Sequence, residues 1–140
     1  MLSQTVEYAL RAVVYLAQHA PEPRKTADIA ATTKVPPAYL SKVLQGLSAQ
    51  EIVKLQRGVG GGVTLAASPR NLTILDVVNA VDPMQRITTC PLKLKTHGMQ
   101  LCALHRRMDN AIKAMEQAFQ STTLAELLED PNPSVPLSEG

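Results

Sequence analysis

The sequence predicts one mainly α-helical domain that carries a small β-hairpin and ends in a long amphipathic helix. Three patterns support this fold class. Apolar residues recur at helical spacing through much of residues 3–81, an alternating segment at residues 52–65 is interrupted by a glycine-rich turn, and a second helical pattern covers residues 102–120. A chain of 140 residues has room for one modest hydrophobic core, so two large domains are excluded.

The first predicted helix covers residues 3–19. Its apolar residues recur every three or four positions, and Ser3 or Thr5 is placed to cap its N-terminus. Pro21 and Pro23 follow directly and end the helix, because proline removes a backbone donor and clashes with the preceding turn.

Two short helices with a tight break between them follow at residues 26–33 and 36–50. Proline suits the first turn of a helix, so Pro36 and Pro37 mark the start of the second one. Leucine and valine side chains are expected to face inward there and polar ones outward. Such a pair resembles a helix-turn-helix, whose second helix reaches base edges in DNA. The candidate DNA-contacting residues in this region are Thr26, Tyr39, Ser41 and Lys42.

A β-hairpin is predicted from two strand-like segments, residues 52–56 and 63–65, around the turn at residues 57–62. A nucleotide-binding loop does not fit, because the spacing that starts at Gly58 requires a glycine at position 63, where the chain has Val63. A hairpin with an arginine at the base of its tip suits a wing that approaches DNA; a merely flexible hairpin is the alternative. The candidate DNA-contacting residues of the hairpin are Gln56, Arg57 and Gly60.

The second half of the chain is also mainly helical. Residues 71–81 form a predicted helix with Thr73 as N-cap, and residues 123–128 form a short capped helix before a loose tail at 131–140. The long helix between them either packs on a partner chain or covers the core of its own chain. Its apolar stripe consists of Leu104, Met108, Ala111, Ile112, Met115 and Phe119.

Charge and composition narrow the possible functions. The net charge is +2, but residues 1–81 carry eight Lys or Arg against five Asp or Glu. A mildly basic first half is consistent with binding to nucleic acid, and equally with an ordinary solvent-exposed surface. The three histidines are not paired with a nucleophile at any familiar spacing, so an enzyme is not expected. No apolar run approaches the ~20 residues that span a bilayer, and we expect a cytoplasmic protein without a membrane partner.

The cysteines suggest a metal site. Cys90 is followed after eleven residues by Cys102, and His105 lies three positions further on. Residues three apart on a helix share a face, so Cys102 and His105 have the spacing of two ligands of one metal. A buried cysteine beside an ordinary surface histidine fits the bare pattern as well. Two cysteines are too few for a secreted disulfide scaffold.

Several stretches together resemble the Rrf2 family of bacterial winged-helix regulators, which includes IscR and NsrR. The resemblance covers residues 1 to about 130. It is carried by Thr5-Val6-Glu7-Tyr8-Ala9-Leu10-Arg11, the helix-turn-helix ending in Tyr39-Leu40, Gln56-Arg57-Gly58-Val59-Gly60-Gly61-Gly62, Asp76-Val77-Val78 and Thr123-Leu124-Ala125-Glu126-Leu127.

The resemblance implies a homodimer whose long helices cross and whose recognition helices and wings contact double-stranded DNA. It also implies four regions. They are a winged helix-turn-helix domain (1–82), a loop that binds an iron–sulfur cluster (83–101), a dimerisation helix with a short capped helix (102–130) and a flexible tail (131–140).

The ligand set implied by the resemblance is incomplete. Cluster-binding members typically have three cysteines in the loop. Here Cys90 and Cys102 match the outer two, and Thr96 stands at the middle position. His105 matches a histidine ligand of one branch, and Glu7 falls where another branch uses a carboxylate of the partner subunit. Two thiolates per subunit favour a [2Fe–2S] cluster completed by imidazole or carboxylate, with His97 and Thr96 in reserve.

The sequence therefore predicts a dimeric transcriptional regulator, a repressor, that senses redox state, nitric oxide or iron–sulfur status through a [2Fe–2S] cluster. Two alternatives stay open. One is a cluster-free regulator that uses the thiols of Cys90 and Cys102 or a protein partner. The other is a metal-binding module that uses the winged helix only to contact proteins.

Overall fold

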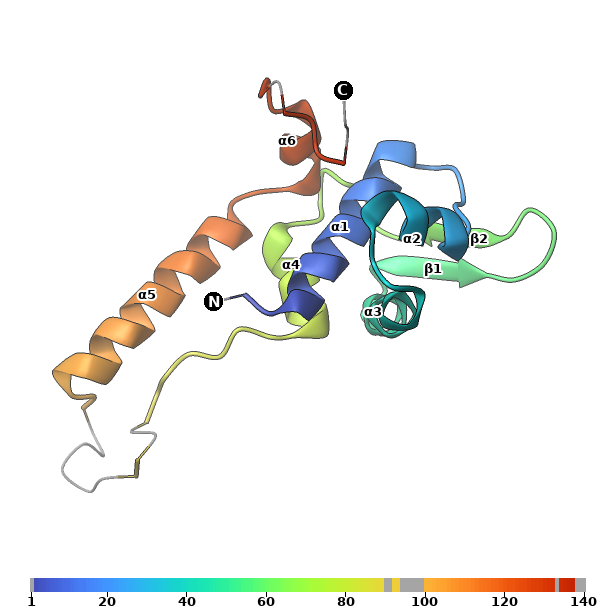
Figure 1. Ribbon diagram of the computed structural model, residues 1–140. Coiled ribbons are helices and arrows are strands. Elements are labelled where there is room, and N and C mark those ends of the chain that lie inside the picture. Colours follow the sequence, from blue (N-terminus) through green and yellow to red (C-terminus); the bar gives the residue numbers. More distant parts are fainter. Residues whose placement is uncertain (1, 90–91, 94–99, 133, 138–140) are drawn as a thin grey trace.

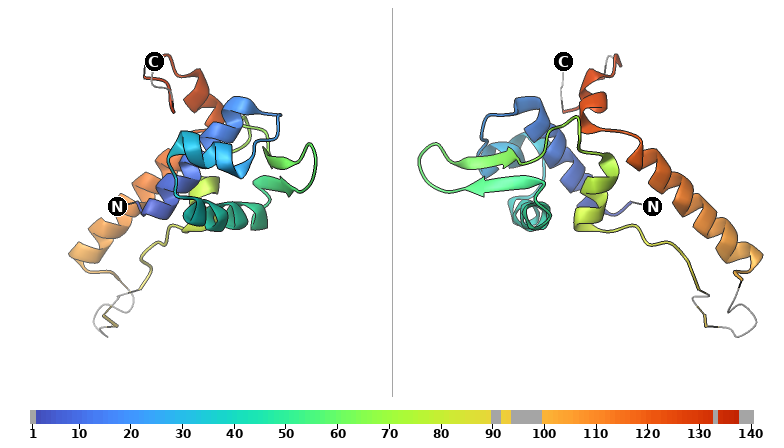
Figure 2. Two further views of the ribbon diagram at one scale, coloured as in Figure 1. Left: turned by 45° about the vertical axis from the view of Figure 1, so that its right-hand side comes forward. Right: turned by 180° about the vertical axis from the view of Figure 1, so that it is seen from behind.

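The computed structural model describes residues 2–89, 92–93, 100–132 and 134–137. One body contains α1 to α4 and the hairpin, and α5 runs away from it on the side opposite the hairpin (Figures 1 and 2). The mainly α fold with a small β-hairpin is therefore confirmed. The elements in chain order are α1 (Gln4–His19), α2 (Thr26–Thr33), α3 (Pro37–Ala49), β1 (Val53–Gln56), β2 (Gly62–Leu65), α4 (Ile74–Val81), α5 (Ala103–Gln120) and α6 (Leu124–Glu129).

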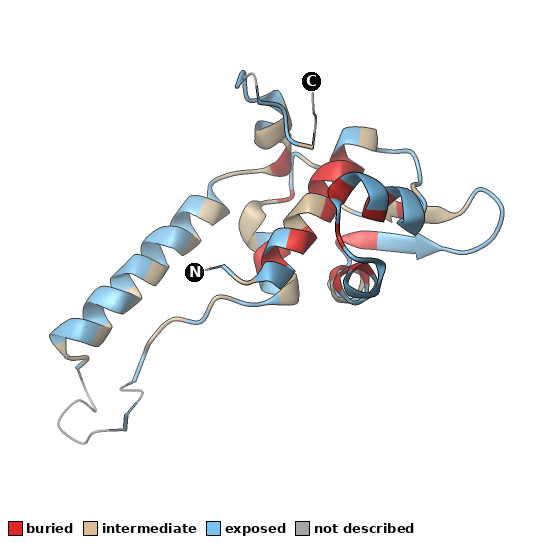
Figure 3. Cartoon of the chain, in the orientation of Figure 1, coloured by how far each residue is buried: buried red, intermediate tan, exposed pale blue. Residues whose placement is uncertain are grey.

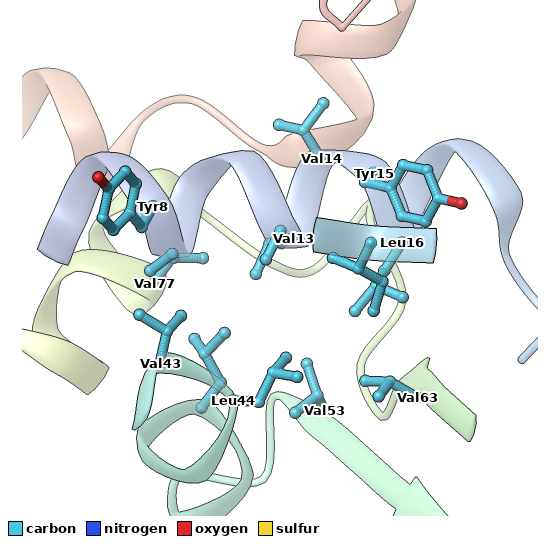
Figure 4. Close-up of a cluster of buried hydrophobic side chains, with 14 of the residues drawn as sticks. Tyr8, Val13, Val14, Tyr15, Leu16, Val43, Leu44, Val53, Val63 and Val77 are labelled. Atoms are coloured by element: carbon cyan, nitrogen blue, oxygen red, sulfur yellow. The ribbon is translucent and has the colours of Figure 1, made fainter. Parts of the chain in front are cut away.

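Helix α1 is the centre of the hydrophobic core. Ser3 caps it, since the Ser3 Oγ accepts a hydrogen bond from the Val6 N–H at 3.3 Å. Nine of its residues are buried, and elements on several sides pack against it (Figures 3 and 4). Leu16 of α1, Leu47 of α3 and Val77 of α4 are at most 1% exposed. Burial of such side chains drives folding and fixes how α2, α3 and the hairpin sit on α1.

The break between α2 and α3 is a tight turn, as a helix-turn-helix requires. The Thr33 Oγ1 donates to the Ile29 carbonyl oxygen at 2.6 Å. Lys34 ends α2 in the left-handed conformation, at φ 59°. Pro37 is then the first residue of α3, where a missing N–H costs nothing. The buried residues of α3 are those that the pattern predicted, namely Leu40, Val43, Leu44 and Leu47.

The first strand begins one residue later than predicted. After α3 the chain forms a Schellman motif, in which the Ile52 N–H donates to the Leu47 carbonyl and the Glu51 N–H donates to the Ser48 carbonyl, both at 3.0 Å. Glu51 adopts φ 59°, a conformation more often taken by glycine. Because Ile52 is used to end the helix, the strand starts at Val53.

The hairpin is antiparallel and is attached to the segment before α2. Val53 pairs with Leu65 and Gln56 with Gly62. Arg24 exchanges two backbone hydrogen bonds with Val63, at 3.0 and 2.8 Å, and so lies beside β2. Gly62 has φ 144°, and a Cβ there would lie 2.8 Å from the Arg24 carbonyl oxygen. Glycine at this position therefore allows the close backbone approach that holds the hairpin against the body.

Helices α4 and α6 begin side by side. Thr73, the predicted N-cap of α4, forms a capping box with Asp76. The Thr73 Oγ1 accepts from the Asp76 N–H at 3.1 Å, and the Asp76 Oδ2 accepts from the Thr73 N–H at 3.0 Å. Thr123 caps α6 in a similar way through the Glu126 N–H. Backbone hydrogen bonds join residues 72–74 to residues 122–124, so the C-terminal end of α5 is fixed to the body.

We expect Thr73→Ala to lower the free energy of unfolding by about 1 kcal/mol, because the Asp76 N–H loses its acceptor. Urea denaturation followed by circular dichroism measures the change. Thr5→Ala is the matched control, since Thr5 lies in the first turn of α1 and Ser3 provides that cap. A loss for Thr73→Ala no larger than the control's few tenths of a kcal/mol would contradict this role.

Helix α5 has no buried residue within the chain (Figure 3). On its apolar stripe, Leu104 is 63% exposed and Met108 is 47% exposed. The stripe therefore does not serve as core of its own chain.

None of the described helices is long and apolar enough to cross a membrane.

Part of the expected loose tail has contacts that the sequence did not predict. The Gln18 Nε2 donates to the Pro136 carbonyl oxygen at 2.7 Å, and Leu137 packs against the core. The described end of the chain thus returns to α1.

Candidate nucleic-acid interface and ligand site

All seven candidate DNA-contacting residues lie on the surface. Tyr39 is 54% exposed, and the other six are exposed as well. Thr26 begins α2, whereas Tyr39, Ser41 and Lys42 lie in the first half of α3. Gln56 ends β1, with Arg57 directly after it. Within the described part of the chain, Arg57 forms no ion pair, so its guanidinium is available to an external anion.

The structure brings three of these residues around one hollow between the hairpin and the start of α2. Thr26, Gln56 and Arg57 line it, together with Lys25, and its volume is about 510 Å³. Gly60 lines a second hollow of about 830 Å³ on the hairpin, again with Lys25. Neither hollow contains Tyr39, Ser41 or Lys42, which belong to the exposed face of α3.

Arg24 and Lys25 are not among the candidates predicted from the sequence, although two adjacent basic residues before a helix are a visible signal. Lys25 lies at both hollows. Arg24 instead supports the hairpin, because its backbone pairs with Val63 and its Nη2 donates to the His19 Nδ1 at 2.8 Å. Lys25 thus adds a cation to the surface that carries Thr26, Gln56 and Arg57, and Arg24 holds the hairpin in place.

Arg11 links α1 to the helix-turn-helix. Its Nε donates to the Glu7 Oε1 at 3.1 Å, and its Nη1 donates to the Thr33 carbonyl oxygen at 3.2 Å. The guanidinium carbon lies 5.5 Å from the centre of the Tyr8 ring, and that ring is 6.0 Å from the Tyr39 ring. The start of α1 is therefore in contact with both the turn after α2 and helix α3.

Two of the predicted metal ligands come together at the start of α5. Cys102 is the N-cap residue, and its Sγ lies 3.3 Å from the His105 Nδ1. Both side chains are partly exposed. Cys90, Thr96 and His97 lie outside the described residues. In the part of the chain that is described, no cluster of three or more His, Cys, Asp or Glu residues is arranged for a metal ion.

Glu7 is not near this pair within one chain. Leu2, Ser3 and Val6, at the start of α1, share a hollow with Ile112 and Met115 in the middle of α5. Ile112 lies ten residues after Cys102, about 15 Å along the helix. A contact between Glu7 and the Cys102–His105 pair therefore requires a second subunit, as the sequence prediction also assumed.

An ion pair joins the chain after α4 to the middle of α5. The Arg86 Nε and Nη2 donate to the two carboxylate oxygens of Asp109, both at 2.7 Å, and the Ile87 N–H donates to the Asp109 Oδ1 at 2.9 Å. The hydrogen bonds from Arg86 lower the pKa of Asp109 to about 2. Asp109 is therefore ionised above pH 4, and the pair weakens only as the pH falls toward 2.

The fold and this surface define a winged helix-turn-helix protein. A family model named Rrf2 and described as an iron-dependent transcriptional regulator matches residues 2–130. NsrR of Geobacillus kaustophilus, named as an HTH-type transcriptional regulator, is 30% identical over 135 residues, which cover 92% of this chain and 90% of NsrR. The chain belongs to the Rrf2 family, whose members are transcriptional regulators and not enzymes.

Solved structures agree with this fold. IscR of T. potens superimposes with a TM-score of 0.77 at 24% identity, covering 94% of this chain and 88% of IscR. CymR (YrzC), titled the global cysteine regulator of B. subtilis, superimposes with a TM-score of 0.76 at 23% identity, covering 94% of this chain and 98% of CymR.

Proposed function

We propose that this regulator is a homodimeric repressor whose affinity for pseudo-palindromic DNA is set by a [2Fe–2S] cluster, through which it senses redox state, nitric oxide or iron–sulfur status. The observation that carries the proposal is the Cys102–His105 contact at the start of α5, where a thiol and an imidazole lie 3.3 Å apart. The description of the family as iron-dependent supports it.

The exposed stripe of α5 supports the homodimer. A contiguous apolar surface on a soluble protein is usually covered by a partner, and a second copy of the same helix offers a self-complementary surface. The helix has 18 residues and is fixed to the body at its C-terminal end. Two such helices packed together would hold two winged domains at a defined separation, as a two-fold symmetric operator requires.

The DNA-contacting surface follows from the same arrangement. In each subunit, the exposed face of α3 with Tyr39, Ser41 and Lys42 would enter the major groove. Arg57 at the base of the hairpin tip would grip a phosphate or reach into the minor groove, with Gln56 and Gly60 beside it. Thr26 and Lys25 at the start of α2 would contact the phosphate backbone.

The donor set suits a mixed-ligand iron–sulfur centre. Cys90 and Cys102 would supply thiolates and His105 an imidazole, and Glu7 of the partner subunit would supply a carboxylate. The bound cluster would supply reversible one-electron chemistry and reactivity toward nitric oxide. Glu7 is paired with Arg11, which also holds the Thr33 carbonyl. A change in the partner of Glu7 would therefore allow α1 to shift against α5 and reorient both recognition helices.

A cluster-free regulator is the second candidate. The thiol of Cys102 favours it, because this side chain is in no disulfide and is partly exposed. In this case the thiols of Cys90 and Cys102 would be the sensor. The visible absorption spectrum of anaerobically purified protein distinguishes the two candidates, since thiols alone do not absorb there.

Selection from a random duplex pool tests the DNA-binding part. We expect the protein to enrich a pseudo-palindrome, to bind it with two chains per duplex, and to lose affinity steeply as salt rises, because phosphate contacts release counterions. Analytical ultracentrifugation of the complex measures the stoichiometry. The proposal is wrong if neither the cluster-bearing nor the cluster-free protein enriches any sequence at low salt.

A further inference from the structure

Helix α5 has an inner face toward its own chain and an outer face toward solvent. The inner face consists of partly buried residues at helical spacing, namely His105, Asp109, Ile112, Glu116 and Phe119. The outer face carries exposed apolar residues, namely Leu104, Met108, Ala111 and Met115. In the proposed dimer the outer face is available to the second copy, so the inner face determines how α5 is attached to its own winged body.

Among the described residues, hydrogen bonds attach α5 to the rest of its chain at two places. At the C-terminal end, backbone hydrogen bonds of 2.8 and 3.0 Å join residues 72–74 to residues 122–124. The second place is Asp109, which lies eleven residues before Gln120, about 16 Å along the helix. Two attachments this far apart fix the direction of a helix, whereas one attachment allows it to pivot.

The attachment at Asp109 is a two-point contact. The Arg86 Nε and Nη2 donate to its two carboxylate oxygens at 2.7 Å, and the Ile87 N–H adds a third donor at 2.9 Å. The Asp109 side chain is 14% exposed, whereas Glu7 in the Arg11–Glu7 pair is 57% exposed. A guanidinium and a carboxylate paired in this way fix orientation as well as distance.

The segment that carries Arg86 is itself tied to α4, because the Met84 N–H donates to the Asn79 Oδ1 at 3.1 Å. Between its two attachments, the middle of α5 lines a hollow of about 280 Å³ together with the start of α1 and residues 82–85. Apolar packing is incomplete at this hollow. The ion pair is therefore what limits the swing of α5 about its C-terminal end.

We propose that Arg86 and Asp109 are positioning residues that hold α5 at a fixed angle to the winged body and thereby set the half-site spacing that the dimer accepts in DNA. Recognition helices read two half-sites only when their separation and rotation match the duplex. This inference deepens the proposed function and rests on its homodimer. The angle itself belongs to a single chain and can be measured without DNA.

The first test compares duplexes that carry the selected half-sites at the selected spacing or with one or two base pairs inserted. Fluorescence anisotropy at one salt concentration measures each dissociation constant. The wild type is expected to prefer the selected spacing by about tenfold or more, because each inserted base pair rotates one half-site by about 35°. In Asp109→Ala this preference is expected to fall to about two- to threefold, because a pivoting α5 adapts to other spacings and loses preorganisation for the selected one.

Three further variants separate positioning from the loss of a charge. Glu116→Ala removes a carboxylate from the same face of α5 and is expected to keep the wild-type preference, since Glu116 forms no ion pair within the described part of the chain. Arg86→Lys keeps the charge without the fork and is expected to lose most of the preference. Arg86→Asp combined with Asp109→Arg re-forms an ion pair and is expected to restore part of it. Circular dichroism checks that each variant is folded.

The second test measures the angle without DNA, by double electron–electron resonance. Spin labels are attached at Ala31→Cys in α2 and Arg107→Cys in α5, both exposed positions, in the full-length chain with its two native cysteines replaced by serine. An excess of unlabelled chains restricts the measured distances to one chain. The distance distribution is expected to be narrow with Asp109 present and broader in Asp109→Ala.

An unchanged spacing preference in Asp109→Ala would overturn the inference, as would equally narrow distance distributions with and without the carboxylate. A wild type that selects no duplex would contradict the proposed function, whereas a broader distribution in Asp109→Ala would still support the fixed angle. A wild type that binds DNA as a dimer while Asp109→Ala keeps the same spacing preference would contradict the positioning role alone.

Discussion

Cys102→Ala protein is expected to contain almost no iron and to lack visible absorption after anaerobic reconstitution, whereas the wild type gains both. Cys102 is one of only two thiols in the chain, and thiolates are the ligands that hold iron–sulfur clusters. Cys90→Ala is expected to behave in the same way. Iron content per chain and the absorption spectrum measure the result.

Replacing either of the two proposed non-thiolate ligands, His105 and Glu7, is expected to lower the iron content less than replacing a cysteine does. His105→Ala and Glu7→Ala should retain some iron but change the spectrum, because each removes one non-thiolate ligand. His19→Ala and Glu126→Ala are the matched controls, since these residues lie on the body and on α6. Full iron loading with an unaltered spectrum would remove His105 or Glu7 from the ligand set. The same result in both cysteine variants would rule out the cluster.

Arg57→Ala is expected to weaken binding to the selected duplex by about 1 to 3 kcal/mol, roughly 5- to 150-fold, if the guanidinium contacts a base. Because Arg57 is exposed and lies in the turn of the hairpin, the variant should fold normally. Fluorescence anisotropy at matched salt measures the affinity. Arg70→Ala is the control, because Arg70 is also exposed but pairs with Glu129 of α6. Equal affinity for Arg57→Ala and wild type would remove Arg57 from the interface.

Much of the fold follows from local patterns in the sequence. Helix α2 has the predicted bounds, and the capping box of Thr73 and Asp76 is present. Such features depend on residues within one or two turns of each other, so a single sequence contains the information. The start of β1 was displaced because Glu51 takes a left-handed conformation that the sequence would sooner assign to glycine.

Contacts between residues far apart in the sequence could not be predicted from local patterns. Arg86 and Asp109 are 23 positions apart, and no periodicity relates them. The return of Pro136 to Gln18 joins residues 118 positions apart. The link from Arg11 to the Thr33 carbonyl also depends on how α1 and α2 pack, which only the assembled core determines. These contacts are therefore known only once the tertiary structure is known.

The candidate site likewise has features that the sequence predicts and features that depend on tertiary packing. The exposure of Tyr39, Ser41 and Lys42 followed from helical periodicity, and that of Arg57 and Gly60 from the glycine-rich turn. The Cys102–His105 contact followed from a spacing of three on a helix. The position of Lys25 beside Gln56 and Arg57 depends on the hairpin lying against the start of α2, which no local pattern predicts. The assignment of Glu7 as a ligand stays a prediction, since it requires the second subunit.

The most direct test of the central claim is an anaerobic titration of the selected duplex with cluster-bearing and with cluster-free protein, at one salt concentration. A cluster that controls DNA binding is expected to change the dissociation constant by about 5- to 150-fold, the usual range of coupling between two sites. The visible spectrum recorded on the same samples reports the cluster content. Equal dissociation constants for the two forms, with the cluster present in one and absent from the other, would contradict the claim.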